Sequence, residues 1–130
     1  MPRLLIIEDH PTNLKLATLI LQSAGHEVLG VENAADGLRA AADWLPDVIL
    51  IDVQLPGMDG LEATRLLKKD EATRSIPVIA LTAFAMEGDS TKMRAAGCDD
   101  YLAKPYRRAV LLEKVDKALG RHTVDGSPPD

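Results

Sequence analysis

Short apolar runs alternate along the chain with longer segments in which apolar residues recur at helical spacing. Three of the runs, residues 4–7, 48–51 and 78–81, are apolar throughout, which is typical of strands buried on both faces of a parallel sheet. The run at residues 27–31 is weaker, and the run at residues 101–103 is short. We predict a β-strand at each of these five runs.

The segments between the runs carry helix signals at their ends. Two pairs have the three-residue offset of a capping motif, Asn33 with Asp36 and Asp59 with Glu62. The predicted helices run from Pro11 to about Gly25, from Asn33 to about Trp44, from Asp59 through Leu67, from about Met86 to Ala96, and from about Arg108 to Leu119.

Five strands that alternate with five helices predict an α/β fold of the flavodoxin-like (βα)5 type. In this three-layer sandwich, a five-stranded parallel sheet is covered by helices on both faces. Right-handed crossovers leave few strand orders, and we expect the order 2-1-3-4-5. We expect residues 1–120 to form this domain and residues 121–130, which contain Gly-Ser-Pro-Pro, to be a flexible tail.

Polar side chains follow four of the predicted strands at the point where each strand ends. Glu8 and Asp9 follow the first strand and Asp52 the third, while Thr82 and Lys104 follow the fourth and fifth. In open parallel sheets, ligands bind beyond the carboxyl ends of the strands, where the strand order switches. We therefore expect these five side chains to converge at one edge of the sheet.

Such a cluster can bind a metal ion and a phosphoryl group. Two unit charges ~4 Å apart interact by about 4 kcal/mol at an effective dielectric of about 20, so three carboxylates favour a bound cation. Oxygen ligands suit Mg²⁺, which Glu8, Asp9 and Asp52 could hold. A carboxylate can also be the nucleophile of phosphoryl transfer, and Lys104 and Thr82 can donate hydrogen bonds to phosphoryl oxygens.

Each of these residues also has a plainer interpretation when it is taken alone. Asp52 could be a turn former or a helix cap, Thr82 a strand-end hydroxyl, and Lys104 a solvated surface lysine. Their occurrence together at successive strand ends favours the functional interpretation. We interpret His10 as a loop residue beside the site.

Composition and charge exclude some classes of function. The net charge of -5 and the pI of about 5.1 argue against a nucleic-acid-binding protein, and aromatic residues are only 3% of the chain, too few for a base-stacking platform. No apolar run approaches the ~18 residues of a membrane-spanning helix. The single cysteine, Cys98, cannot form an internal disulfide, and we expect a cytoplasmic protein.

From Arg3 to Leu119 the chain resembles the CheY-like receiver domain of bacterial two-component response regulators. The motifs that carry this resemblance are Ile-Ile-Glu-Asp at 6–9, Leu-Ile-Asp at 50–52, Leu-Pro-Gly-Met-Asp-Gly at 55–60, Ala-Leu-Thr-Ala at 80–83 and Tyr-Leu-Ala-Lys-Pro at 101–105. The run Thr-Ala-Phe-Ala-Met-Glu-Gly-Asp at 82–89 also resembles single-domain regulators of the DivK type and receivers of hybrid kinases.

The resemblance implies a phosphorylation switch. Asp52 would be the phosphoacceptor, and Glu8, Asp9, Asp52 and the backbone carbonyl of Gln54 would bind Mg²⁺, for which Mn²⁺ could substitute. The phosphoryl group would come from a sensor histidine kinase or a histidine phosphotransfer protein. The chain would not otherwise be an enzyme, since it would catalyse only its own phosphoryl transfer and autodephosphorylation.

The resemblance also assigns residues to the switch itself. Thr82 and Lys104 would bind the phosphoryl group, Tyr101 would be the switch aromatic, and the bond between Lys104 and Pro105 would be cis. Tyr101 could equally be a packed surface aromatic. Output would pass to a protein target through the face formed by the predicted helices at Met86–Ala96 and Arg108–Leu119 and the strand at 101–103, in a monomer or a phosphorylation-dependent dimer.

Gln54 and Phe84 stand two residues after Asp52 and Thr82. From this placement we expect them to control the access of water to the acyl phosphate and hence its lifetime.

Two other classes of protein share parts of this pattern. An Mg²⁺-dependent phosphohydrolase with an aspartyl nucleophile would resemble Asp-x-Asp, whereas Asp52-Val53-Gln54 lacks the second acid. A flavodoxin-like electron carrier would need a phosphate-binding loop after the first strand, where Glu8 and Asp9 stand instead. Within the receiver family, the sequence leaves open a free-standing regulator or a receiver of a hybrid kinase.

Overall fold

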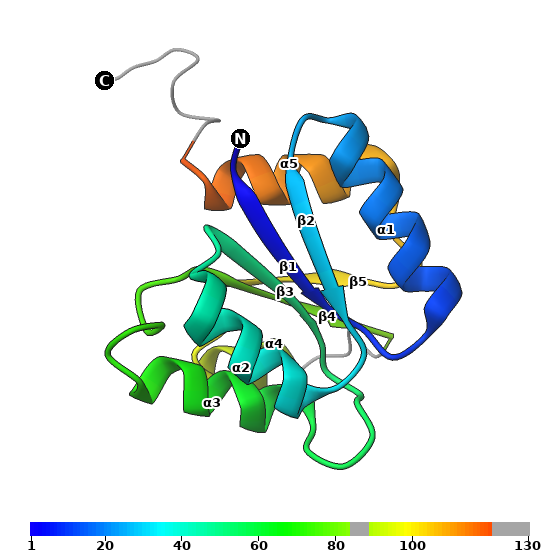
Figure 1. The fold of residues 1–130 in the computed structure, drawn as a ribbon. Coiled ribbons are helices and arrows are strands. Elements are labelled where there is room, and N and C mark those ends of the chain that lie inside the picture. Colours follow the sequence, from blue (N-terminus) through cyan, green and yellow to red (C-terminus); the bar gives the residue numbers. More distant parts are fainter. Residues whose placement is uncertain (84–88, 121–130) are drawn as a thin grey trace.

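The computed structural model describes residues 1–83 and 89–120, in which five strands alternate with five helices (Figure 1). The elements are β1 (Arg3–Ile7), α1 (Pro11–Ser23), β2 (Glu27–Val31), α2 (Ala34–Trp44), β3 (Val48–Asp52), α3 (Gly60–Lys69), β4 (Val78–Thr82), α4 (Asp89–Ala96), β5 (Asp100–Ala103) and α5 (Arg108–Ala118). All strands pair in parallel in the order β2-β1-β3-β4-β5. The predicted flavodoxin-like fold and strand order are confirmed. The expected tail and the predicted helix start at Met86 lie outside the described residues.

Helices cover both faces of the sheet, with α1 and α5 on one face and α2, α3 and α4 on the other (Figure 1). Each face has its own apolar core, because side chains of a strand point alternately to the two sides. Leu4 and Ile6 pack toward α1 and α5, whereas Leu5 and Ile7 pack toward the other three helices. Among the described residues, none of the helices combines the length and hydrophobicity that a bilayer crossing requires.

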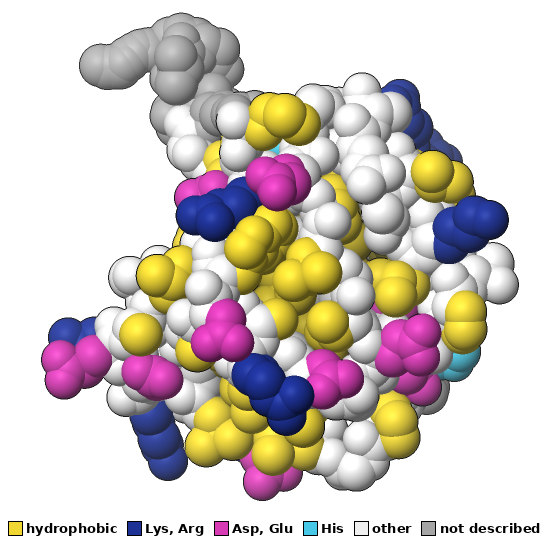
Figure 2. Space-filling view, in the orientation of Figure 1, with side chains coloured by type: hydrophobic (Ala, Val, Ile, Leu, Met, Phe, Trp, Pro, Cys, Tyr) yellow, Lys and Arg dark blue, Asp and Glu magenta, His cyan; other side chains and the backbone are white. Residues whose placement is uncertain are grey.

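The burial of the strands explains the strength of their sequence signals. Every residue of β3 and β4 is buried, as are residues 4–7 of β1. β2 lies at the edge of the sheet, and its Leu29 is 37% exposed. In the view of Figure 2, hydrophobic side chains gather over the middle of the molecule. An edge strand with a solvent-exposed side needs fewer apolar residues, which accounts for its weaker pattern.

Both predicted capping pairs are confirmed. The side chain of Asn33 accepts a hydrogen bond from the backbone N–H of Asp36 at 2.8 Å, and Asp59 accepts one from Glu62 at 2.8 Å. These bonds satisfy backbone donors that the first helical turn leaves unpaired. They therefore define where α2 and α3 begin.

Lys68 joins α3 to the start of β4. Its ammonium donates hydrogen bonds to the carbonyls of Arg74 at 3.2 Å and Ile76 at 2.8 Å, and to Oδ2 of Asp99 at 3.0 Å. The same oxygen of Asp99 accepts a hydrogen bond from the backbone N–H of Val78 at 2.8 Å. This network anchors the end of β4 that lies opposite its functional end.

Gly60, at the start of α3, packs directly against the backbone at the end of β3. Its N–H donates to the carbonyl of Val53 at 2.9 Å. A Cβ atom at this position would overlap the backbone carbonyl of Asp52. Glycine is therefore required for the close approach of α3 to the segment that carries Asp52.

Replacing Gly60 by alanine should lower the free energy of unfolding by about 2 kcal/mol, because overpacking against a rigid neighbour is costly. The control is Gly37→Ala, where the added methyl group would meet the flexible end of the Ile7 side chain and the loss should be smaller. Urea unfolding of both variants measures the difference. Equal losses would contradict this account of Gly60.

Candidate functional site

The register of the sheet brings the ends of four strands to one edge. Ile7 pairs with Ile51, so the residues that follow them, Glu8 and Asp52, emerge side by side from β1 and β3. Asp52 pairs with Leu81, which places Thr82 one residue further along on the neighbouring strand. The backbone N–H of Lys104 donates to the carbonyl of Thr82 at 2.7 Å, which holds the end of β5 against β4.

The Lys104 ammonium lies between two buried carboxylates. Nζ is 2.8 Å from Oδ2 of Asp52 and 2.7 Å from Oε1 of Glu8. The side chains of Asp52 and Glu8 are only 4% and 2% exposed, and that of Lys104 is 17% exposed. Charged groups this poorly solvated are tolerated only when they are paired, so these three side chains form one unit.

The surroundings of Lys104 raise its pKa above the ordinary value of 10.5. Burial alone would lower this pKa, but the hydrogen bonds that the ammonium donates to Asp52 and Glu8, together with their negative charges, outweigh that effect. Lys104 is therefore a permanent cation at physiological pH.

Both oxygens of Asp52 have hydrogen-bond donors. Oδ2 accepts from Lys104, and Oδ1 accepts from the backbone N–H of Gln54 at 2.8 Å. The carboxylate plane is thus fixed by a backbone group on one side and an ammonium on the other. This arrangement orients Asp52 toward the space that Glu8 and Asp9 share with it.

The carboxylates at this edge form a cluster suited to a cation. Glu8, Asp9, His10 and Asp52 each offer one ligand atom, and these atoms lie within 4.8 Å of one another. Oδ1 of Asp9 is buried and, although it is 3.3 Å from Nδ1 of His10, it accepts no hydrogen bond in the described part of the chain. A buried carboxylate oxygen without a donor fits a site for a hard divalent cation.

His10 contacts the acidic pair directly, whereas its position in a loop predicted only that it lies beside the site. Its Nδ1 is 3.1 Å from Oε2 of Glu8 while its side chain stays 63% exposed. The hydrogen bond with Glu8 and the negative charge of Asp9 raise the pKa of His10 above 6.5. The only sequence signal for this contact is its position directly after the acidic pair.

The other predicted site residues lie around this cluster. Thr82 is buried at the end of β4, and the Lys104–Pro105 peptide bond is cis. Gln54 is exposed, and Phe84 lies outside the described residues. Tyr101 is partly buried against the core beneath α2, α3 and α4, and Nζ of Lys114 is 5.8 Å from its ring centroid.

Comparison with known proteins identifies relatives along nearly the whole chain. Residues 4–116 match the family model of the response regulator receiver domain. The polar-differentiation response regulator DivK of Brucella anthropi is 41% identical over 121 residues, which are 92% of this chain and 98% of that protein. DivK of Brucella ovis is 41% identical over 116 residues, which are 89% of this chain and 94% of that protein.

Solved structures give the same result. The receiver domain of the sensor histidine kinase PA1611 of Pseudomonas aeruginosa PAO1, with a magnesium ion coordinated in its active-site cleft, matches with a TM-score of 0.86 and 39% identity. That match covers 92% of this chain and 98% of the other. The chemotaxis response regulator CheY4 of Vibrio cholerae matches with a TM-score of 0.87 and 26% identity, covering 92% and 99% of the two chains.

Replacing Lys104 by methionine should lower the free energy of unfolding by about 3 kcal/mol at neutral pH, because it leaves buried carboxylates without a counter-ion. The folded-state pKa of Lys104 lies above 10.5, so its stabilisation is complete below about pH 10.5 and is lost as pH rises through the folded-state value. Urea unfolding from neutral pH to about pH 11 should show the wild type and the variant converging.

The matched control for this prediction is Lys15→Met, which removes an exposed lysine from α1. It should leave the free energy of unfolding within about 0.5 kcal/mol of the wild type. A Lys104→Met protein as stable as this control would contradict the role of the ammonium.

Proposed function

Because the chain belongs to the family of response regulator receiver domains, which are signalling proteins, we propose that its phosphoacceptor is Asp52. The donor is a phosphohistidine on a sensor histidine kinase or a histidine phosphotransfer protein of a two-component system or phosphorelay. The observation that carries this proposal is the Lys104 ammonium within hydrogen-bond distance of both Asp52 and Glu8.

In the proposed reaction, a carboxylate oxygen of Asp52 attacks phosphorus and the bond between phosphorus and the histidine nitrogen breaks. The electron pair of that bond returns to the imidazole ring. Gln54 holds the nucleophile in place through its backbone N–H. Lys104 neutralises charge on the incoming phosphoryl group, and its buried position makes that interaction stronger than it would be in water.

We propose Mg²⁺ as the cofactor, held by Glu8, Asp9, Asp52 and the backbone carbonyl of Gln54. The acidic cluster supports this, as do the buried Oδ1 of Asp9, which accepts no hydrogen bond among the described residues, and the magnesium ion in the related receiver from Pseudomonas aeruginosa. When bound, Mg²⁺ supplies positive charge to the phosphoryl oxygens. Mn²⁺ has similar oxygen-ligand chemistry and should substitute.

The switch that we propose begins at Thr82. Phosphorylation replaces the single negative charge of the Asp52 carboxylate with a phosphoryl group of about -1.5 to -2 charge, to whose oxygens the Thr82 hydroxyl and Lys104 can donate hydrogen bonds. The backbone hydrogen bond from Lys104 to Thr82 links these two residues. Tyr101 lies on β5, the strand that Lys104 follows, and responds to their rearrangement. Coupling energies of about 1–3 kcal/mol are enough to change the affinity for a partner on the α4-β5-α5 face.

The finer properties of the switch are part of the same proposal. Gln54 and Phe84 set the rate of autodephosphorylation, so replacing Gln54 by alanine should change the half-life of the phosphorylated protein. We further propose a cytoplasmic protein that is a monomer or dimerises on phosphorylation. An unchanged half-life in Gln54→Ala would remove the tuning role.

Mg²⁺ should raise the thermal midpoint of the wild type, because a ligand that binds only the folded state stabilises it by about 1.4 kcal/mol at ten times Kd. Asp9→Asn should abolish most of this shift, whereas Asp43→Asn, a substitution of an exposed aspartate on α2, should retain it. Thermal unfolding with and without MgCl₂ measures both. Equal shifts in all three proteins would show that Asp9 is not a ligand.

Incubation with acetyl phosphate and Mg²⁺ should add one phosphoryl group to the wild type, measured by intact mass. Asp52→Asn should show no mass gain, because the amide is not a nucleophile, and Asp43→Asn should react like the wild type. A mass gain in Asp52→Asn would move the acceptor elsewhere, and no gain in the wild type would overturn the proposed function.

A further inference from the structure

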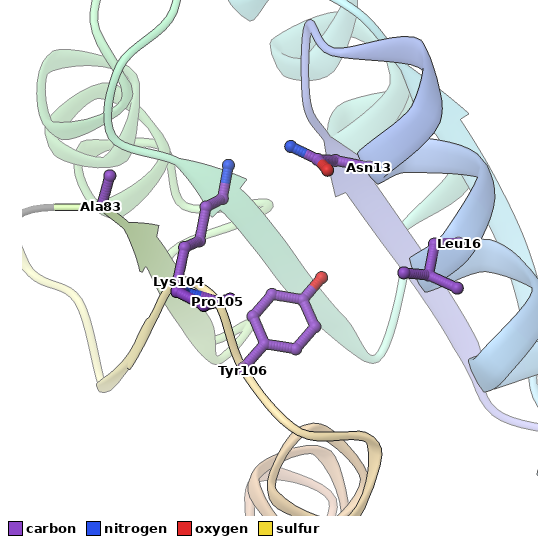
Figure 3. A pocket seen from close by; sticks show the side chains of 6 residues that line it. All are labelled: Asn13, Leu16, Ala83, Lys104, Pro105 and Tyr106. Atoms are coloured by element: carbon purple, nitrogen blue, oxygen red, sulfur yellow. The ribbon is translucent and has the colours of Figure 1, made fainter.

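A cavity of about 360 Å³ lies between the start of α1 and the connection from β5 to α5. Its lining consists of Asn13, Leu16, Ala83, Lys104, Pro105 and Tyr106. Lys104 belongs both to this lining and to the ion-pair cluster with Asp52, so the cavity adjoins the phosphorylation site. Figure 3 shows the Tyr106 phenol and the Asn13 amide facing the same space, with the Lys104 amine beside it.

The hydroxyl of Tyr106 is a hydrogen-bond donor that faces this cavity. Its ring is partly buried against the core beneath α1 and α5. Among the described residues, the hydroxyl makes no hydrogen bond. Burial raises the pKa of Tyr106 above 10.0, and the charges of Glu8 and Asp52 add to this while that of Lys104 opposes it. The phenol therefore keeps its proton at neutral pH and can act only as a neutral hydrogen-bond partner.

A phosphodonor that reacts at Asp52 brings its leaving group to this edge of the sheet, and the cavity adjoins Asp52 through Lys104. When Asp52 forms its new bond to phosphorus, the bond to the donor atom breaks and its electron pair remains on that atom. With an acyl phosphate the pair stays on a carboxylate oxygen, which becomes negatively charged. With a phosphohistidine it stays on the ring nitrogen. Both atoms become hydrogen-bond acceptors as the bond breaks.

We propose that Tyr106 is a specificity-determining residue of the phosphoryl-transfer reaction, whose hydroxyl donates a hydrogen bond to the leaving atom of the phosphodonor. This inference rests on the proposed function of Asp52. The hydroxyl favours donors whose leaving atom becomes negatively charged, because a charged acceptor forms a stronger hydrogen bond than a neutral lone pair. Leu16 and Pro105 give the cavity apolar walls, which suit the carbon atoms of an organic leaving group such as acetate or imidazole.

The test compares wild type and Tyr106→Phe with two small phosphodonors in the presence of Mg²⁺. Acetyl phosphate releases acetate, an anion that accepts a strong hydrogen bond. Phosphoramidate that is protonated on nitrogen releases neutral ammonia, which is stabilised less by a hydrogen bond from the Tyr106 hydroxyl. Removing the hydroxyl should slow phosphorylation by acetyl phosphate about tenfold, the kinetic equivalent of one hydrogen bond to a charged group, and by phosphoramidate less than about twofold.

Initial rates of phosphorylation are measured by intact mass at pH 7 and saturating Mg²⁺. For each protein they give the ratio of the rate with acetyl phosphate to the rate with phosphoramidate. Phenylalanine keeps the ring and its packing, and circular dichroism and the thermal midpoint verify the fold. A similar slowing with both donors, or no slowing with either, would overturn the role of the hydroxyl while the proposed function stands. A wild type that accepts no phosphoryl group from either donor would overturn the proposed function itself.

Discussion

The site depends on one electrostatic constraint, which is that two carboxylates are buried next to each other. Glu8 and Asp52 come from adjacent strands and are almost fully withdrawn from water, so each would be unstable as an isolated anion. The ammonium of Lys104 makes their coexistence possible by bonding to both. The same interaction connects β5 to β1 and β3, which are not its neighbours in the sheet. Structure and chemistry therefore depend on the same three side chains.

The fold stabilises this arrangement of charges by fixing the backbone of the residues that carry them. β3 and β4 are buried throughout, so the positions of Asp52 and Thr82 are set by the packing of the core and not by loops. Gly60 allows α3 to press against the end of β3, and Lys68 ties the opposite end of β4 to α3. These contacts hold in place the backbone that carries Asp52 and Thr82.

Much of this could be predicted from the sequence, because parallel strands bring their carboxyl ends to a common edge. The convergence of Glu8, Asp52 and Lys104 follows from that geometry alone, and the capping pair at Asn33 follows from local hydrogen bonding. The contact of His10 with Glu8 could not be predicted, nor could the position of the Tyr106 hydroxyl, which makes no hydrogen bond in the part of the chain that the structure describes. Both depend on rotamers and on which helix packs beside them, and no spacing along the chain encodes either.

The burial of the strands has a consequence for how such a protein diversifies. The reacting groups rest on the interior of the molecule, whereas the outer surfaces of the helices contribute little to holding them in place. Leu19 on α1 is 54% exposed and can be exchanged without displacing Asp52. Duplicated genes could therefore acquire new recognition surfaces, and be insulated from one another's signals, while they inherit an unaltered reaction.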